Sequence, residues 1–206
     1  MMFQTFEGTY RRDPVDTAGP TSNAVSSGHS SLQELIEEFG GASFNGGLYR
    51  IIRAEDLGGW NERVTLAFPS FKGRIACFGY DWSGRVFAAD AGRPVEGQAG
   101  VVMFEPGGGE ALNVPANIES FHNKELVEFS EAALAVSFYL QWLASGRQAP
   151  NQTQCVGYRV PLFLGGADEL DNLELSDLDV YWHLLGQLIV QARGLPVGTP
   201  IRIKRT

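Results

Sequence analysis

Short apolar segments separated by turn signals fill residues 44–114, and this pattern constrains the fold more than any other feature. Apolar, aromatic and β-branched residues alternate in six runs, at 48–53, 64–68, 74–80, 85–89, 101–105 and 111–114. Glycine-containing turns separate the runs, as at Ser83-Gly84 and Pro106-Gly107-Gly108-Gly109. Connections this short can join antiparallel neighbours but leave no room for crossover helices. The pattern therefore predicts an antiparallel β-meander of five or six strands.

Helical patterns flank this predicted sheet. Ser31-Leu32-Gln33-Glu34 is a capping box, and the helix that it starts ends at Gly40-Gly41. A second pattern predicts helix over about 123–145, with Ser130 as a candidate cap for a separate helix. Its apolar stripe comprises Leu126, Phe129, Ala133, Val136, Leu140 and Leu143.

The last predicted helix begins near Ser176 or Asp177 and ends at Gly194. Its expected inward residues are Leu178, Tyr181, Trp182, Leu185, Leu188 and Ile189. Helix, then sheet, then helices indicates an α+β fold: an antiparallel meander flanked by an N-terminal helix and C-terminal helices.

We divide the chain of 206 residues into three parts. Residues 1–30 are a predicted flexible N-terminal arm, because the stretch around 13–31 is rich in Ser, Gly, Pro and Thr. Residues 31–118 hold the N-terminal helix and the sheet, and residues 119–206 form a helical module packed on the same globule. Within that module Pro161 demotes the apolar segment 158–164 to an edge strand or an extended segment.

Six carboxylates lie between residues 168 and 179, and no Lys or Arg interrupts them. They belong to Asp168, Glu169, Asp171, Glu174, Asp177 and Asp179. Because like charges repel, a chain that keeps such a run is a candidate for binding a positively charged partner. The alternative is that the charge only keeps an acidic protein soluble. The net charge of -8 argues against nucleic acid as a direct partner, since phosphate binding needs a basic face.

The sequence contains no pattern that is typical of a reaction centre. It has no Gly-x-Ser-x-Gly, and the glycines at 107–109 turn between strands instead of opening a phosphate-binding helix. His122 has Glu119 and Glu125 at three-residue steps, a weak metal pattern that charge placement at a helix start explains as well. His183 fits an i,i+4 pair on a solvated helix face. We therefore predict no catalytic residue, no cofactor, no metal and no enzyme activity.

Aromatic residues are candidates for anchoring a partner. Trp82, in the turn Asp81-Trp82-Ser83-Gly84, either projects as an interface anchor or covers the edge of the sheet. Tyr158 and Phe163 are further candidates, and both would equally fit the core.

The two cysteines and the hydropathy pattern bear on the compartment. Cys77 and Cys155 are isolated among apolar neighbours and are expected to be buried, reduced thiols. The first residues do not resemble a signal peptide, and no apolar run reaches the length of a membrane span. We expect a cytoplasmic protein without a membrane partner.

Several short runs resemble one protein family. They are Phe39-Gly40-Gly41-Ala42-Ser43-Phe44-Asn45-Gly46-Gly47-Leu48-Tyr49-Arg50, Phe78-Gly79-Tyr80-Asp81-Trp82-Ser83-Gly84-Arg85, Phe104-Glu105-Pro106-Gly107, Leu164-Gly165-Gly166, Asp171-Asn172-Leu173 and Val180-Tyr181-Trp182. Together, over roughly 32–195, they look like the type VI secretion DNase-immunity family, which is similar to the wider SUKH-type immunity proteins. Relatives often begin with a longer part related to a glutamyl-tRNA-amidotransferase-like domain, where this chain has its Ser/Gly/Pro-rich arm.

The resemblance implies an antitoxin-like protein that binds a co-encoded nuclease toxin and blocks it without catalysis. A DNase presents a basic groove to its substrate, so an acidic partner is steered towards it. We expect the six carboxylates and Trp82 to contact the toxin. The alternatives are a general SUKH-like interaction or regulatory module, and a small-molecule enzyme or ligand-binding domain. A deep apolar pocket lined by His122 or His183 would favour the last of these.

Overall fold

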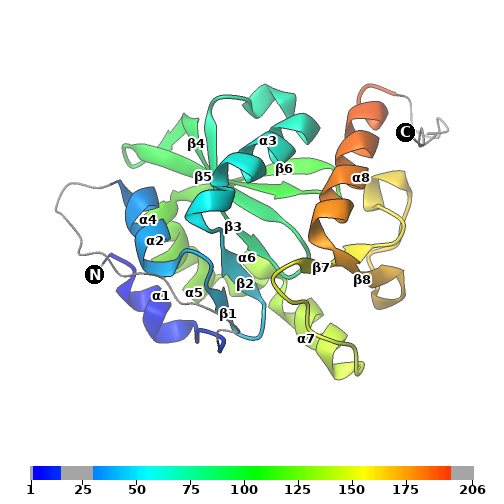
Figure 1. Cartoon of the computed structure of the whole chain (residues 1–206), viewed down its shortest axis with the longest axis horizontal. Helices are drawn as coiled ribbons and strands as arrows, with labels where there is room; N and C mark the ends of the chain where they lie inside the picture. Colours follow the sequence, from blue (N-terminus) through cyan, green and yellow to red (C-terminus); the bar gives the residue numbers. More distant parts are fainter. Residues whose placement is uncertain (1, 15–29, 196–206) are drawn as a thin grey trace.

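The computed structural model describes residues 2–14 and 30–195 (Figure 1). Residues 15–29, half of the predicted arm, and the C-terminal residues 196–206 lie outside the described residues. The centre is a six-stranded antiparallel sheet in which the strands follow one another in sequence order. They are β1 (Ser43–Phe44), β2 (Tyr49–Ile51), β3 (Ile75–Asp81), β4 (Val86–Val95), β5 (Gln98–Glu105) and β6 (Glu110–Asn117). The predicted α+β meander is confirmed.

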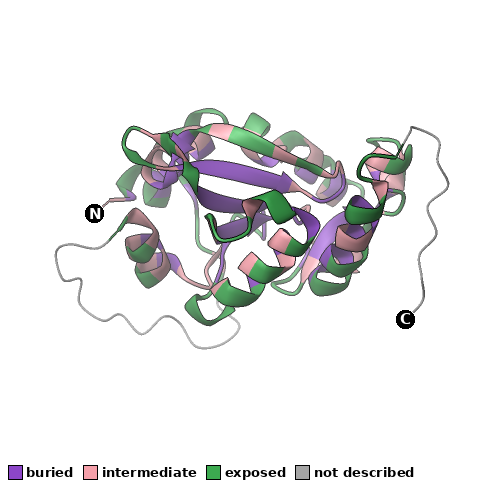
Figure 2. Ribbon diagram, turned by 90° about the horizontal axis from the view of Figure 1, so that it is seen from above, coloured by how far each residue is buried: buried purple, intermediate pink, exposed green. Residues whose placement is uncertain are grey.

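Helices cover both faces of this sheet (Figures 1 and 2). Alternate residues of a strand point to opposite faces, so Phe87 and Met103 enter one apolar cluster while Val86 and Val102 enter a second one. The first cluster contains side chains of α1 (Gln4–Thr9), α2 (Ser31–Phe39), α4 (Ile118–Ser120), α5 (Leu126–Glu128), α6 (Ser130–Leu134) and α7 (Val136–Ala144). The second contains side chains of α3 (Leu57–Ala67) and α8 (Leu178–Ala192).

The first residues of the chain pack on the globule, which the expectation of an arm over 1–30 did not anticipate. Phe3 and Phe6 are buried, with ring centroids 5.9 Å and 5.7 Å from that of Phe39. The Tyr10 hydroxyl donates a hydrogen bond to the Leu126 carbonyl at 2.8 Å. Helix α1 therefore contributes to the first core cluster. The proposed boundaries at residues 30 and 118 stay a prediction.

The strand predicted at 64–68 is wrong. Residues 64–67 form the last turn of helix α3, and Phe68 is its C-cap. Trp60, Val64 and Ala67 are the buried residues of this helix, at a spacing of four and three. Gly58 and Gly59 concealed that period, since two adjacent glycines read as a turn. The meander still has six strands, because β1, which was not predicted, replaces the strand expected at 64–68.

The predicted helix over 123–145 is divided into shorter pieces. It opens with a π-helical turn at Phe121–Glu125. The expected break near Ser130 is confirmed, because α6 begins there, but the N-cap of α6 is Phe129 and not Ser130. A second break falls at Ala135, which has a left-handed backbone (φ 49°). This break changes the inward face of α7, so that Trp142 is buried whereas Leu140 of the predicted stripe is 57% exposed.

A second, two-stranded antiparallel sheet follows, formed by β7 (Gln154–Tyr158) and β8 (Leu173–Asp177). The extended segment expected at 158–164 is therefore displaced: β7 ends at Tyr158, and a 3-10 turn occupies Leu162–Leu164. Strand β8 was not anticipated, because it lies inside the acidic run.

Helix α8 agrees with its prediction. The Asp177 carboxylate caps it, accepting a hydrogen bond from the Val180 backbone N–H at 2.9 Å. All six residues expected to face inward are buried. Cys77 and Cys155 are also buried and free, as expected.

Close packing between β7 and α8 gives a first testable prediction. A Cβ on Gly157 would lie 2.3 Å from the Tyr181 ring, so Gly157→Ala should lower the free energy of unfolding by about 1–3 kcal/mol. A Cβ on Gly58 in α3 would meet nothing within 4 Å, so Gly58→Ala should raise it by about 0.5–1 kcal/mol. Urea denaturation of both variants measures the difference. Equal midpoints would contradict the packing of Tyr181 on β7.

Candidate functional site

The six carboxylates of the acidic run all lie at the surface, around β8 and the start of α8. Asp168, Glu169 and Asp171 belong to the loop that joins β7 to β8, and Glu174 lies on β8. The Asp168 carboxylate accepts a hydrogen bond from the Tyr158 hydroxyl at 2.5 Å. Burial, followed by this hydrogen bond, raises the pKa of Tyr158.

Arginines from elsewhere in the chain neutralise half of this charge. The pairs are Arg147–Asp171 at 3.7 Å, Arg159–Glu174 at 3.4 Å and Arg63–Asp179 at 2.8 Å. Exposed pairs of this kind contribute little stability, but each one weakens the local field. The run is therefore less negative than its sequence suggests.

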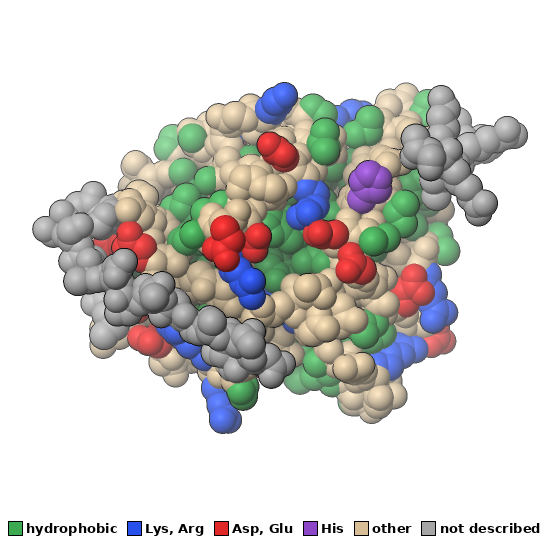
Figure 3. Space-filling model, in the orientation of Figure 1, with side chains coloured by type: hydrophobic (Ala, Val, Ile, Leu, Met, Phe, Trp, Pro, Cys, Tyr) green, Lys and Arg blue, Asp and Glu red, His purple; other side chains and the backbone are tan. Residues whose placement is uncertain are grey.

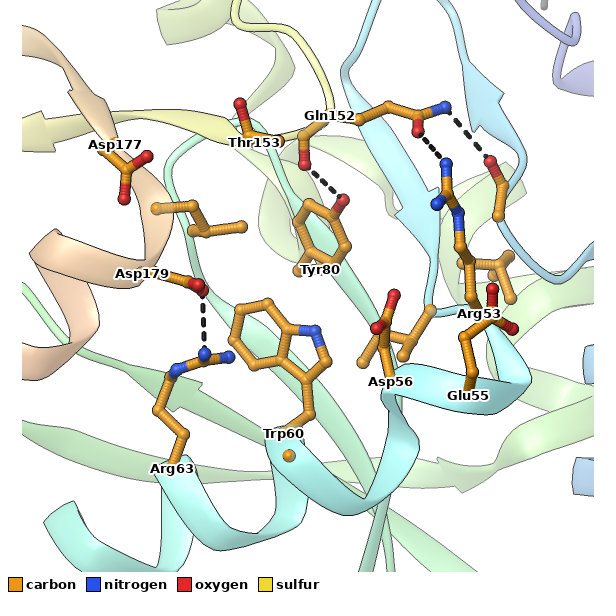
Figure 4. Close-up of a pocket in the computed structure, with 15 residues that line it drawn as sticks. Arg53, Glu55, Asp56, Trp60, Arg63, Tyr80, Gln152, Thr153, Asp177 and Asp179 are labelled. Atoms are coloured by element: carbon orange, nitrogen blue, oxygen red, sulfur yellow. Dashed lines mark hydrogen bonds and ion pairs between the residues drawn. The ribbon is translucent and has the colours of Figure 1, made fainter. Parts of the chain in front are cut away.

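A recess with a volume of about 380 Å³ opens beside the start of α8 (Figure 4). Trp60 and Tyr80 lie in its lining with their rings stacked, centroids 5.5 Å apart. Asp177 and Asp179 contribute from one side, and Glu55 from the other. In Figure 3 hydrophobic surface is visible between groups of acidic side chains on this face. We call this site the acidic recess.

Negative charge exceeds positive charge in the acidic recess. Its lining holds four carboxylates (Glu55, Asp56, Asp177, Asp179) and two guanidinium groups (Arg53, Arg63), which leaves a charge of -2. Both arginines are engaged: Arg63 Cζ lies 4.5 Å from the Trp60 ring centroid, and Arg53 donates to Gln152 Oε1 at 2.9 Å. An aromatic surface bordered by surplus carboxylates suits a cationic side chain with an aliphatic stem.

The structure places Trp82 in the core. Its side chain is 1% exposed, and Nε1 donates a hydrogen bond to the Leu134 carbonyl at 2.8 Å. The position agrees with a packing role and gives no surface for a partner, so Trp82 is not part of the interface proposed below. Tyr158 and Phe163 are half-buried.

Sequence reasoning missed two exposed apolar residues of α8, which follow Asp179 of the recess lining in the chain. Val180 and Leu184 are 54% and 41% exposed, one turn apart on α8. The sequence does contain a signal for them. An apolar residue of α8 that does not belong to the inward face is expected to be exposed, and both residues meet this condition. His183 lies between them and contacts Gln187 at 2.8 Å between nitrogen atoms, as the i,i+4 interpretation predicted.

His122 is a core residue and not a surface group at a helix start. It is fully buried, with Nδ1 2.7 Å from the Ile118 carbonyl oxygen and Nε2 3.0 Å from the Tyr49 hydroxyl. Neither His122 nor His183 lines the acidic recess. Within residues 2–14 and 30–195, no three His, Cys, Asp or Glu side chains are grouped so that they could hold a metal ion.

The burial of His122 predicts a fold that weakens in acid. Burial lowers its pKa to about 4, whereas in the unfolded chain it is about 6.5. Between these values the unfolded chain binds a proton that the folded chain does not. The free energy of unfolding should therefore fall by about 3 kcal/mol as the pH drops from about 6.5 to about 4.

Glu105 acts in the opposite sense. Burial raises its pKa to about 7, despite the lowering effect of Arg85. Its contribution to stability is lost as the pH rises from about 4.5 to about 7. Urea denaturation between pH 4.5 and 6.5 should give a steeper acid loss in Glu105→Gln than in the parent, and a shallower one in His122→Gln. If the free energy of unfolding depends on pH with the same slope in all three proteins, the buried environments described for His122 and Glu105 are contradicted.

Fold and site together define an α+β protein with an antiparallel sheet between two helical layers and an acidic recess on its surface. The crystal structure of Atu4351 from Agrobacterium tumefaciens has a similar fold, with a TM-score of 0.54. The likeness covers 82% of this chain and 84% of that chain at 14% sequence identity, so it concerns the fold alone. No curated protein matches the chain.

Residues 116–189 match a family model described as the C-terminal region of the type VI secretion (T6SS) immunity protein Tdi1. The matched part begins in β6, ends in α8 and includes the whole acidic run. The match supports a type VI secretion immunity family and suggests an immunity function. None of the helices in the described part combines the length and the apolar character that crossing a membrane requires.

Proposed function

We propose that this protein is a cytoplasmic, SUKH-like immunity protein that binds and neutralises a cognate type VI secretion nuclease toxin, a DNase, without catalysis of its own. The observation that carries the proposal is the family match over 116–189, which contains the acidic run and one side of the acidic recess. We extend the proposed interface from the run 168–179 to the other side of the recess, where Glu55 and Asp56 lie.

Electrostatics supports a basic partner. A DNase needs a positively charged surface to engage phosphates, and this chain has a net charge of -8. Opposite fields accelerate the encounter of two proteins, and carboxylates can occupy a groove that otherwise holds phosphates. The proposed complex therefore forms by association of the acidic recess with the basic surface of the toxin.

Charge alone would leave the complex sensitive to salt, so tight inhibition needs contacts that exclude water. Val180 and Leu184 provide exposed apolar surface on α8, shortly after Asp179 of the recess lining. Inside the acidic recess, the stacking of Arg63 on Trp60 beside Asp179 is an intramolecular example of the cation binding that we propose for an Arg or Lys of the toxin.

Recovery of the natural partner tests the proposal. The chain, tagged and purified from its native cell, should retain a nuclease-domain protein that mass spectrometry identifies. The purified pair should no longer cleave DNA, whereas the nuclease alone should do so. Recovery of a partner without nuclease activity, at a fixed molar ratio to the tagged chain, would contradict the proposal and favour the general regulatory module instead.

A further inference from the structure

A buried guanidinium lies outside the acidic recess and has no role in the proposed interface. Arg50 of β2 is 2% exposed, and its Nη2 donates a hydrogen bond to the Pro150 carbonyl. Its Nε and Nη1 atoms are buried and have no hydrogen-bond partner within the described residues. No carboxylate of residues 2–14 or 30–195 forms an ion pair with it.

The chain is shaped to accommodate this group. Tyr49 and Ile51 point into the first core cluster, so the intervening Arg50 points to the other side of the strand. There its Cζ lies 5.6 Å from the centroid of the Tyr80 ring. Gly47, with a φ of +87°, makes room for it, because a Cβ at this position would lie 2.5 Å from Nη2 of Arg50. The local backbone geometry thus leaves room for the Arg50 side chain.

Arg50 forms part of the wall of a cavity of about 500 Å³. Pro150, which accepts the Nη2 hydrogen bond, also lines this cavity, so Nη2 of Arg50 lies next to the cavity wall. Arg53, Asn151 and Gln152 add further hydrogen-bonding groups to the lining.

One carboxylate lines the same cavity, but it is already bound. Asp13 accepts hydrogen bonds from the backbone N–H groups of Gly46 (2.6 Å) and Gly47 (2.8 Å) and from the Ser43 hydroxyl (2.6 Å). The cavity lining therefore carries two guanidinium groups and one engaged carboxylate, a surplus of one positive charge in a chain of net charge -8.

A buried cation is costly unless an anion or several acceptors compensate it. The fork of N–H donors in a guanidinium matches two oxygens of a carboxylate or a phosphate group. We propose that the cavity beside Arg50 is an oxyanion-binding site, in which Arg50 and Arg53 hold a carboxylate or phosphate group. This inference does not rest on the proposed immunity function, although Arg53, Gln152 and Thr153 line the acidic recess as well.

Titration of the full chain with inorganic phosphate, and separately with acetate, at constant ionic strength tests the site. The Nε–H cross-peak of Arg50 in a ¹H–¹⁵N spectrum, assigned by its loss in Arg50→Met, should shift with saturation. The midpoint temperature of unfolding should rise with the same dependence on concentration. Whichever anion gives the tighter dissociation constant identifies the class of oxyanion.

Variants separate this site from general salt effects. Arg53→Gln should weaken the dissociation constant by about tenfold, as expected for the loss of one charge-assisted hydrogen bond. Lys72→Gln, which removes an exposed charge elsewhere, should leave it unchanged. A response that is absent for both anions, or identical in Arg53→Gln and Lys72→Gln, would overturn the proposal even if Arg50→Met does not fold.

Discussion

Replacing Asp81 with alanine should lower the free energy of unfolding by about 3–5 kcal/mol, the range found when one partner of a buried ion pair is removed. Asp81 is fully buried, and its Oδ2 lies 2.6 Å from Nε and 2.5 Å from Nη2 of Arg85. Its Oδ1 accepts hydrogen bonds from the backbone N–H groups of Ser83 and Arg85. Asp81→Ala thus leaves a buried guanidinium and also removes bonds that hold the turn between β3 and β4.

Glu105 limits this loss, because its Oε2 lies 3.7 Å from Arg85 Nε. Arg85→Met in the Asp81→Ala background removes the stranded charge and should recover part of the lost stability. Urea denaturation of the parent, the single variant and the double variant measures both effects. A double variant that is less stable than Asp81→Ala alone would show that the uncompensated charge is not the main cost.

Reversing the charge of the acidic recess should slow association with the toxin by about tenfold or more at low salt. The variant is Glu55→Lys with Asp56→Lys, because both carboxylates lie in the recess lining and neither caps α8. The effect should shrink as ionic strength rises, since salt screens charges beyond about 10 Å at 0.1 M. Stopped-flow mixing with the purified toxin gives the association rate.

Two further charge reversals serve as comparisons. Glu119→Lys with Glu128→Lys makes the same change in net charge on α4 and α5, which pack on the opposite side of the sheet. This pair should alter the rate far less. Changing Asp168, Glu169, Asp171 and Glu174 together to Lys tests the run directly. If the α4–α5 pair slows association as much as the recess pair does, the interface lies elsewhere.

The meander and α8 were predictable because their signals are local. Alternation and glycine turns lie within a few residues of each strand, and the stripe of α8 is uninterrupted from Leu178 to Ile189. The strand predicted at 64–68 and the inward face predicted for α7 were wrong, because the local signal was ambiguous there. Gly58-Gly59 obscured the helical period of α3. The left-handed conformation of Ala135, which is rare for alanine, changed the inward face of α7.

The candidate site was predictable only in part, because it depends on residues far apart in the chain. The acidic run is visible in the sequence, but Arg63, which pairs with Asp179, lies on α3. The acidic recess likewise combines α3, β3 and the start of α8 around Trp60 and Tyr80. Such pairings follow from the packing of α3 beside α8, which a single sequence does not specify.

Hydrogen–deuterium exchange of the chain, alone and bound to its toxin, tests most directly the claim that the acidic recess is the binding surface. Protection on binding should concentrate in 54–63, 150–153 and 168–184, which contain lining residues of the recess and the acidic run. Protection confined to α1, α2 and α4–α7, with these segments unchanged, would contradict the account.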